Sequence, residues 1–368
     1  MTFGPMVSIK DIARAAGVSH STVSRSLRDS PLVNAQTKAR IRQLAQEAGY
    51  SPHAGARSLV MGRTRTIGVV VTTIADPFVA EVVQGIESAA YRHDHTVILA
   101  TSGSEPQREI AAVDMLRSKR VDGVIVTSSR IGALYHEHLE RIGVPVVLIN
   151  DHSNQRGRYT FSVTVDNVHG ARLATQHLLA LGHRSIAHIA GPEGHSSSAD
   201  RLSGYRSALE SAGAAFDARL VFPGNGLATG GRDALERLLN MPERPTAVFC
   251  YNDMTAVGLL RACHDRGLRL PGDLAVVGFD DIPFAALCAP SLTTVAQPKL
   301  DMGQQAVAMV LALAEAGDAS RPNVADAVVQ GNLIVRESSG APPWHPSRSR
   351  RGPGPASDKE RGSCAAAR

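Results

Sequence analysis

The 368-residue sequence is poor in cysteine and aromatic residues, and it contains no long apolar run. Its cysteines show no paired spacing, which argues against a disulfide framework and suits a reducing compartment. They are Cys250, Cys263, Cys288 and Cys364. No stretch of about 18 apolar residues predicts a membrane span. No basic segment followed by an apolar core predicts a signal peptide. We therefore expect a cytoplasmic protein with free thiols and no membrane partner.

Signatures of catalysis and of cofactor binding are also missing from the sequence. No strand-turn-helix G-x-S-x-G surrounds the serines near His195, which we interpret as pocket and loop hydroxyls. No glycine-rich phosphate loop appears. The pairs His93/His95 and His136/His138 lack the spacing of known metal sites, and surface histidines are the simpler interpretation. We expect no catalytic residue, no metal and no cofactor, with an enzyme on the same kind of body as an alternative.

Charge is unevenly distributed along this chain, whose net charge is +5. Residues 1–65 carry ten Lys or Arg and three acidic residues, and residues 341–368 carry six basic and two acidic residues. The segment between them is therefore net acidic. A basic N-terminal piece on an acidic body is typical of a DNA-binding head, although a solvated charged face is the alternative. The segment 341–368 is rich in Pro and Gly, and we expect it to be disordered.

The first 50 residues predict three short helices in a small all-α head. "SIKD" at 8–11 fits a capping box and predicts the start of the first helix, which Gly17 ends. Ser19 caps a second helix, and Asn34 opens a third. A second helix that follows the first after one tight turn has helix-turn-helix geometry and enters the major groove of DNA. Any helical hairpin with a glycine turn can mimic this pattern.

The second helix of the head is rich in side chains that suit DNA. Its short hydroxyls fit phosphate oxygens and belong to Ser19, Thr22 and Ser24. Arginine can bind guanine through two hydrogen bonds. The side chains expected to face base edges are His20, Ser21 and Arg25.

From Thr66 the pattern changes to short strands rich in Val and Ile, with helical patterns between them. The strands are "TIGVVVT", "HTVILAT", "VDGVIVTS", "VPVVLIN" and "FSVTVD". Such alternation predicts a parallel sheet with helices on both faces, and it repeats after Asp166. The body is therefore expected to hold two doubly wound parallel-sheet lobes. Ligands of such sheets bind beyond the carboxyl ends of the strands, which predicts a ligand cleft between the lobes.

Residues 7–340 resemble the lactose/galactose repressor (LacI/GalR) family. The matching pieces, in the family's order, include "IKDIARAAGVSHSTVSRSL", "YSPHAGARSL", "DPF", "RVDGVIV", "VDN", "HLLALGHRSIAHIAGP", "RLSGY", "PTAVFCYND", "VVGFDD" and "LTTVAQP". The resemblance implies a homodimeric transcriptional repressor that binds a palindromic operator in double-stranded DNA. It implies a periplasmic-binding-protein-like body with a small-molecule effector between the lobes. It also implies that the chain crosses between the lobes three times.

The resemblance divides the chain into four parts. A helix-turn-helix domain spans 7–50, a hinge helix or linker spans 51–65, an effector-binding and dimerisation body spans 66–340, and the tail follows. The hinge would fold on the operator, where Arg57 and Leu59 join the DNA contacts. Leu59 matches a leucine that wedges into the minor groove, and its alternative is an ordinary interdomain core residue. Gly55 departs from the bulkier residue usual in this hinge.

The resemblance also assigns an effector pocket, and its donors and acceptors suit a sugar or polyol. Its residues are Phe78, Asn150, Asp151, His195, Ser197, Arg201, Asn252 and Asp280. Gly226 falls where purine-type and lactose-type members place a stacking aromatic residue, which favours carbohydrate over a nucleobase. His195 replaces an arginine of the purine-binding members, so a sugar acid or sugar phosphate also fits. A structural salt bridge between Arg201 and Asp280 across the cleft is the alternative.

A sugar-binding solute protein would share this two-lobed body and is the second alternative. The first 60 residues and the missing signal peptide argue against it. Tetramers of the family use a C-terminal leucine heptad helix, which the Pro- and Gly-rich segment 341–368 cannot form, so we expect a dimer.

Overall fold

The computed structural model describes residues 7–50, 63–127, 143–150, 160–316 and 324–340. The chain forms two compact units. The first contains Met1–Thr164 and Lys299–Ala327, and the second contains Val165–Pro298 and Val328–Arg368. The chain therefore crosses between them three times, as the resemblance implies. The predicted hinge contacts Arg57 and Leu59, together with Gly55, Asp151 and the tail, lie outside the described residues.

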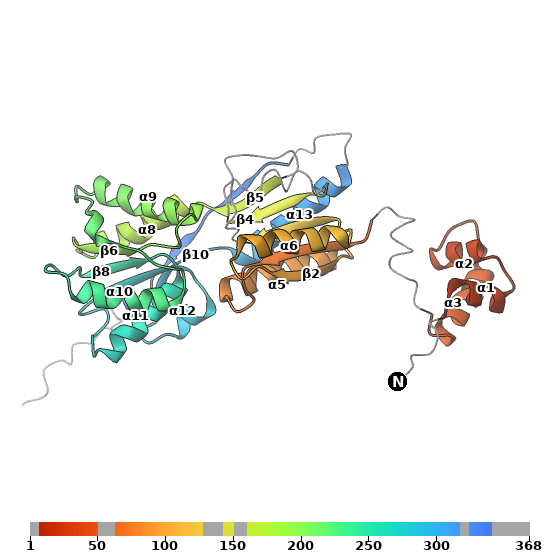
Figure 1. The fold of residues 1–368 in the computed structure, drawn as a ribbon, viewed down its shortest axis with the longest axis horizontal. Coiled ribbons are helices and arrows are strands. Elements are labelled where there is room, and N and C mark those ends of the chain that lie inside the picture. Colours follow the sequence, from red (N-terminus) through yellow and green to blue (C-terminus); the bar gives the residue numbers. More distant parts are fainter. Residues whose placement is uncertain (1–6, 51–62, 128–142, 151–159, 317–323, 341–368) are drawn as a thin grey trace, which may run out of the picture. The chain divides into compact units, whose positions relative to one another are not determined.

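The head consists of three helices, α1 (Ile9–Ala16), α2 (His20–Leu27) and α3 (Ala35–Glu47), as predicted (Figure 1). The capping box is present, since the Ser8 amide donates to the Asp11 carboxylate over 3.0 Å. Gly17 ends α1 at a φ of 67°, a conformation that glycine adopts without a steric penalty. One residue from each helix is almost fully buried in the small core, namely Ile12, Val23 and Ile41.

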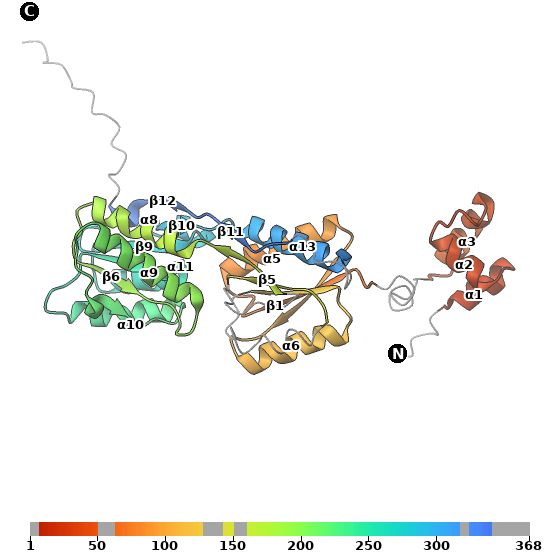
Figure 2. The same cartoon turned by 90° about the horizontal axis from the view of Figure 1, so that it is seen from above.

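The first unit contains a six-stranded sheet in the order β11-β5-β4-β3-β1-β2. The strands are β1 (Thr66–Val71), β2 (Thr96–Thr101), β3 (Gly123–Thr127), β4 (Val146–Ile149), β5 (Thr160–Val165) and β11 (Ala327–Val329). Strands β1 to β5 are parallel. Figure 2 shows α6 (Pro106–Ser118) on one face, and α5 (Pro77–Arg92) and α13 (Lys299–Ala316) on the other. This arrangement gives the doubly wound lobe expected from the βαβ pattern.

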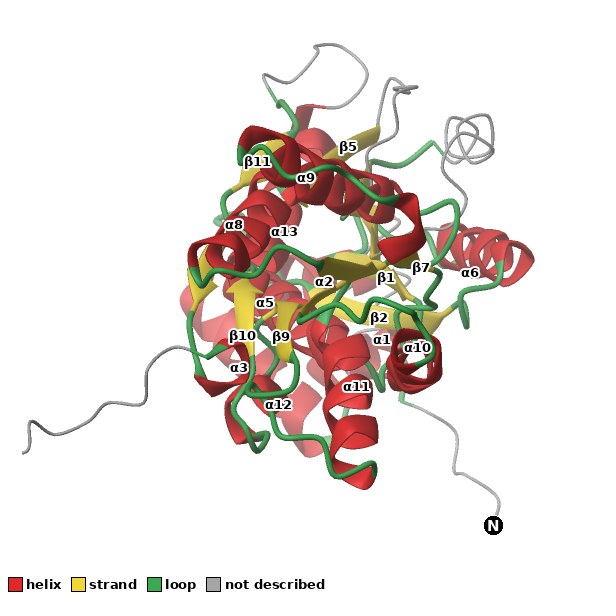
Figure 3. Cartoon of the chain, turned by 90° about the vertical axis from the view of Figure 1, so that its left-hand side faces the viewer, coloured by secondary structure: helices red, strands yellow, loops and turns green. Residues whose placement is uncertain are grey.

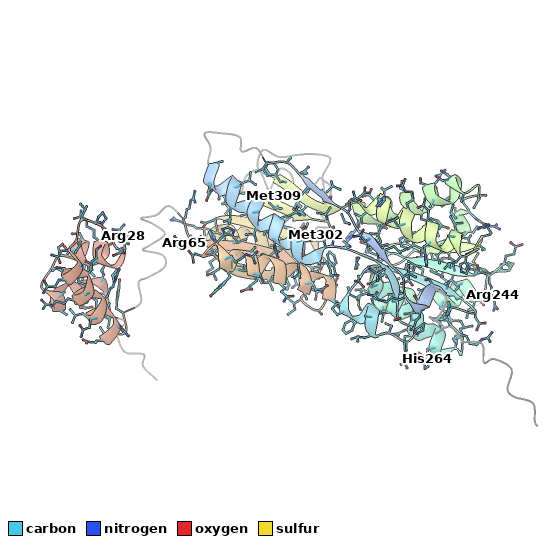
Figure 4. The ribbon with its side chains drawn as sticks, turned by 180° about the vertical axis from the view of Figure 1, so that it is seen from behind. Arg28, Arg65, Arg244, His264, Met302 and Met309 are labelled. Atoms are coloured by element: carbon cyan, nitrogen blue, oxygen red, sulfur yellow. The ribbon has the colours of Figure 1, made fainter. Side chains whose placement is uncertain are left out.

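The core of the first unit follows from the runs of Val and Ile in its strands. All of β1 after Thr66 is buried, and Val124 and Val126 of β3 pack on Leu116 of α6. A strand that is apolar on both sides is what a sheet covered on both faces requires. On the opposite face α13 presents Met302 to the core, while Met309 of the same helix is only half-buried (Figure 4).

The second unit repeats this architecture with the strand order β12-β10-β9-β8-β6-β7. Its strands are β6 (Ile186–Ile189), β7 (Val221–Phe222), β8 (Ala247–Cys250), β9 (Ala275–Asp280), β10 (Thr293–Ala296) and β12 (Asn332–Ile334). Only β12 pairs in an antiparallel way among the ladders of the described residues of this sheet. Its helices are α8 (Asn167–Ala180), α9 (Ser196–Ser211), α10 (Ala228–Leu239), α11 (Asp253–Asp265) and α12 (Pro283–Leu287).

The two faces of the second sheet are covered by different helices. Figures 1 and 3 show α8 and α9 on one side of the strands, and α10, α11 and α12 on the other. The predicted fold class, a helix-turn-helix head with two doubly wound lobes, is confirmed. One local prediction was wrong, because Ser196, Ser197 and Ser198 form the first turn of α9 and do not lie in a loop. No helix in the described ranges is long and apolar enough to cross a membrane.

Candidate functional site

The candidate DNA-binding surface is α2, whose N-terminus is built by Ser19. The Ser19 hydroxyl accepts a hydrogen bond from the Thr22 amide over 3.1 Å, which caps the helix. It also lies 2.8 Å from the Ser21 hydroxyl and 2.9 Å from the Thr22 hydroxyl. Two of the residues predicted to bind phosphate, Ser19 and Thr22, therefore form a hydroxyl cluster at the cap together with Ser21, which was predicted to face base edges.

Val23 and Ser26 of α2 face inward, while His20, Ser21 and Arg25 are exposed. The third predicted hydroxyl, Ser24, is already engaged by a residue that sequence reasoning missed. Arg28, at the C-terminal end of α2 (Figure 4), donates to the Ser24 carbonyl and to its hydroxyl, each over 3.1 Å. We therefore add the Arg28 guanidinium to the basic face that α2 presents.

The candidate ligand-binding surface of the second unit lies at the carboxyl edge of its sheet. Five parallel strands end at this edge, and each is followed by polar residues or a glycine-rich turn. Asp280 is the last residue of β9, and Asn252 follows β8. Ser197 and Arg201 lie on α9, which follows β6. The structure thus brings four of the predicted pocket residues to the edge where ligands of such sheets bind.

Arg201 is buried at this edge, with 2% of its surface exposed, and its guanidinium contacts several residues of the second unit. Its Nε donates to the Asn167 side chain over 2.9 Å, and its Nη1 donates to the Tyr251 carbonyl over 2.6 Å. The guanidinium carbon lies 3.7 Å from the ring centroid of Phe279. Two of the three guanidinium nitrogens therefore make hydrogen bonds within the second unit. The third, Nη2, makes no hydrogen bond to the described part of the chain.

The carboxylate of Asp280 lies beside Arg201, with 3.8 Å between Nη1 and Oδ1. Both residues belong to the second unit, so this ion pair forms within one lobe and does not bridge the two. Gln297, which follows β10, donates to Asp280 Oδ1 over 2.6 Å. Asp280 has a φ of 124°, which residues other than glycine rarely adopt and which costs about 1–3 kcal/mol. Such strain is common at functional sites.

Two further contacts fix the turn that carries Asp280. Asp281 has a φ of 53° and forms an ion pair of 2.7 Å with Arg336. Beneath the turn, the fully buried Asp253 accepts a hydrogen bond from the Ile282 amide over 2.9 Å. Burial, and secondly the charge of Asp280, raise the pKa of Asp253 well above its usual value. The turn is therefore held from both sides in a conformation that it would not adopt by itself.

Asn252 and Ser197 complete the polar edge. The Asn252 side-chain oxygen caps α11 by accepting from the Thr255 amide, while its nitrogen donates to the Gly226 carbonyl over 2.9 Å. The buried Ser197 hydroxyl lies 2.8 Å from the Tyr251 hydroxyl. His195, the residue before α9, is half-buried.

The first unit places its two described pocket residues at the carboxyl edge of its own sheet. Phe78 lies in the first turn of α5, after β1, and its amide donates to the Asp76 carboxylate over 2.9 Å. Its side chain is 6% exposed, so it belongs largely to the core. Burial raises the pKa of Asp76. Asn150 follows β4 with a φ of 57° and is half-buried.

Sequence reasoning missed four residues of the second-unit edge, namely Asn167, Tyr251, Asp253 and Gln297. All four were visible in the quoted motifs "VDN", "FCYND" and "LTTVAQP". For Tyr251, Asp253 and Gln297 the missed signal is position, because residues that follow the parallel strands β8 and β10 share one edge of the second sheet. Asn167 follows β5, a strand of the first sheet, so its place beside Arg201 could not be inferred in this way. The described residues contain no group of three or more His, Cys, Asp or Glu that could hold a metal ion.

Comparison with protein families gives two matches that together cover the head and most of the second unit. Residues 8–53 match the model of bacterial regulatory proteins of the lacI family. Residues 175–339 match the periplasmic binding protein-like domain.

Relatives extend the similarity over most of the chain. The transcriptional repressor PurR of Vibrio atlanticus is 37% identical over 310 residues, which are 83% of this chain and 91% of that protein. The transcriptional repressor CytR of Escherichia coli K12 is 34% identical over 339 residues, which are 91% of this chain and 97% of that protein.

Solved structures agree with these relatives. The lac repressor dimer bound to operator and the anti-inducer ONPF is 28% identical with a TM-score of 0.81, over 91% of this chain and 99% of the other. The transcriptional regulator CelR in complex with cellobiose is 33% identical with a TM-score of 0.68, over 90% of this chain and all of the other.

Proposed function

The chain belongs to the lacI family of bacterial regulatory proteins, and from this premise we propose that it represses transcription as an effector-controlled homodimer. It is a DNA-binding transcriptional repressor with a ligand-binding domain and not an enzyme. In the proposal, the dimer binds a palindromic operator of about 14–20 base pairs in the cytoplasm, because paired recognition helices need half-sites about one helical turn apart.

The recognition helix carries the proposal. Ser19 caps α2 and Val23 anchors it in the head, so that His20, Ser21 and Arg25 remain exposed on one short helix. A helix N-terminus also favours phosphate oxygens. A solute-binding protein built on the same body would have no use for this face.

The proposed effector is a sugar or sugar derivative bound at the carboxyl edge of the second unit. Asp280 supports it with a carboxylate that accepts from hydroxyls. Asn252 supports it with the second N–H of its side-chain amide, because its oxygen accepts from Thr255 and its first N–H donates to Gly226. Arg201 contributes Nη2, the guanidinium nitrogen that it does not use elsewhere in the described chain. Phe78, Asn150 and Asp151 stay predicted members of the effector pocket by the family resemblance. A structure of the similar regulator CelR holds cellobiose, a carbohydrate.

Selection of bound sequences from random double-stranded DNA tests this function. The full-length protein should enrich one palindrome, and mobility shifts on that palindrome should show a single dimer complex. Sugars, sugar acids, sugar phosphates and nucleosides are then added to the preformed complex. Enrichment of a palindrome whose complex a carbohydrate releases or tightens would support the proposal. Failure to enrich any sequence would refute the DNA-binding part, while a response to nucleosides alone would refute the effector class.

A further inference from the structure

The Tyr251 ring packs against two glycines, Gly191 and Gly226, at the carboxyl edge of the second sheet. A Cβ atom added at Gly191 would lie 2.5–2.7 Å from three ring carbons of Tyr251, so only the bare backbone of Gly191 leaves room for the ring. A Cβ at Gly226 would lie 3.5 Å from the same ring and 3.5 Å from Pro192. The Tyr251 ring thus extends from Gly191 toward the turn that contains Gly226.

The backbone at Gly226 cannot easily carry a side chain of its own. Its φ is 73°, which L residues rarely adopt, and its carbonyl is fixed by the Asn252 amide over 2.9 Å. An aromatic side chain at 226 would be strained and would compete with the Tyr251 ring for space. The aromatic group of this edge therefore comes from the end of β8 and not from the turn after β7.

Three contacts hold the Tyr251 ring in place. Its hydroxyl lies 2.8 Å from the buried Ser197 hydroxyl, and its carbonyl accepts from Arg201 Nη1 over 2.6 Å. The Arg201 guanidinium lies 4.6 Å from the ring centroid, within the range of a cation–π contact. A ring fixed at its hydroxyl, its backbone and its π system has few rotamers open to it, so a ligand cannot displace it cheaply.

We propose that Tyr251 is the residue that sets ligand size at this edge, by filling the space that a planar ring of the ligand would need. The site then accepts a single-ring polyhydroxy compound and rejects the same sugar when it carries an added planar ring, as in a nucleoside or a phenyl glycoside. The polar groups of Asp280 and Asn252 at the same edge suit hydroxyls and not an aromatic face. This inference rests on the proposed effector site of the second unit.

Calorimetry with the full-length protein tests the inference through two substitutions. Tyr251→Ala removes the ring, whereas Tyr251→Phe keeps the ring and removes only the hydroxyl. The probes are D-glucose, D-galactose and D-ribose, their methyl and phenyl β-glycosides, adenosine and cytidine. The wild-type protein should bind a free sugar or its methyl glycoside with at least about tenfold higher affinity than the phenyl glycoside or nucleoside of the same sugar. A filled pocket discriminates by that much or more. Tyr251→Ala should reduce or reverse this preference by at least about tenfold, and Tyr251→Phe should keep it.

A second pair of variants tests the contact with Gly191. Gly191→Ala should push the ring toward the ligand and weaken sugar binding. The same change in the Tyr251→Ala background should have little effect, because the ring that the new methyl group meets is absent. Non-additive effects of this kind are expected of residues in contact.

Mobility shifts on the selected operator accompany each binding measurement. Operator binding by every variant without ligand, combined with an unchanged ring preference in Tyr251→Ala, would overturn the inference and leave the repressor function standing. Equal binding of sugars and nucleosides by the wild type, or no binding of any probe by any variant, would overturn it too. Loss of operator binding by the wild type would instead indicate failure of the proposed function.

Discussion

Asp253 and Thr294 form a hydrogen bond of 2.6 Å between two fully buried side chains, beneath the turn that carries Asp280. The other carboxyl oxygen of Asp253 accepts from the Ile282 amide. One residue of α11 therefore ties β10 to the turn after β9. Burial raises the pKa of Asp253, and the nearby charge of Asp280 raises it further. The fold favours a neutral Asp253 at the base of the candidate ligand site.

This raised pKa predicts a pH-dependent stability. The folded chain binds the Asp253 proton more tightly than the unfolded chain does. The resulting stabilisation is fully present below the ordinary pKa of 3.8 and is lost as pH rises through the folded-state pKa. Asp253→Asn is neutral at every pH, and a hydroxyl can accept as well as donate, so the amide satisfies both contacts. We expect the difference in urea midpoint between Asp253→Asn and the wild type to move in favour of the variant as pH rises.

Two controls accompany this measurement. Asp253→Ala leaves the Thr294 hydroxyl and the Ile282 amide buried without their partner, so it should cost about 2–4 kcal/mol. Asp265→Asn, at the exposed end of the same helix, weakens only a surface ion pair with Arg261, so its pH dependence should stay close to that of the wild type. A pH dependence identical in Asp253→Asn and the wild type would show that Asp253 does not titrate differently in the folded chain.

Arg25→Ala tests the recognition helix. The Arg25 side chain is exposed on α2, so its removal should leave the head folded. If Arg25 reads a guanine, the variant should lose about 1–3 kcal/mol of operator affinity and relax the preference at one base per half-site. The control is Arg14→Ala, on the exposed face of α1, which should at most weaken binding uniformly across sequences. Selection with both variants is the measurement, and an unchanged base preference in Arg25→Ala would exclude this role.

Most of the fold could be predicted from the sequence because its signals are local. Runs of Val and Ile mark strands buried on both faces, and caps such as Ser19 and Asn34 mark helix starts. The helices α10, α12 and α13 were not singled out in the sequence. Gly230 and Gly231 lie in the first turn of α10, and glycine is a weak helix former. What stabilises α10 is its packing on α11, a tertiary effect that no local pattern contains.

The sequence predicted which side chains lie at the carboxyl edge of the second sheet, but not the contacts among them. Strand ends bring Arg201, Asn252 and Asp280 to one edge, as parallel topology requires. The sequence did not show that Arg201 uses most of its guanidinium inside its own lobe, because those contacts reach Asn167 and Tyr251, residues far from it in the chain. Contacts of this kind depend on how helices settle on the sheet, and spacing along the chain does not encode them.

Asp280→Asn tests the effector site with the least disturbance. The amide keeps the size of the side chain and an oxygen that can accept from Gln297. Hydrogen bonds to a charged group contribute about 1.5–3 kcal/mol, so effector affinity should fall by about 10- to 150-fold while operator binding remains. Arg201→Ala is a poorer test, because removing this buried guanidinium leaves the Asp280 carboxylate without its ion-pair partner. The loss should cost about 3–5 kcal/mol of stability. Calorimetry and urea unfolding of both variants separate the effects, and wild-type effector affinity in Asp280→Asn would remove Asp280 from the site.

The close approach of α10 and α11 in the second unit predicts a stability effect with a matched control. A Cβ atom added at Gly258 of α11 would overlap the backbone carbonyl of Ala228 at the start of α10, and that carbonyl cannot move without shifting the helix. Gly258→Ala gains up to about 1 kcal/mol of helix propensity but should lose more, since overpacking costs about 1–3 kcal/mol or above. Gly272→Ala makes the same chemical change where the nearest atom, the Arg269 carbonyl oxygen, is 3.8 Å away. The control should therefore be neutral or more stable by about 0.4–1 kcal/mol. Urea midpoints measure both, and equal shifts in the two variants would mean that α10 and α11 can move apart at little cost.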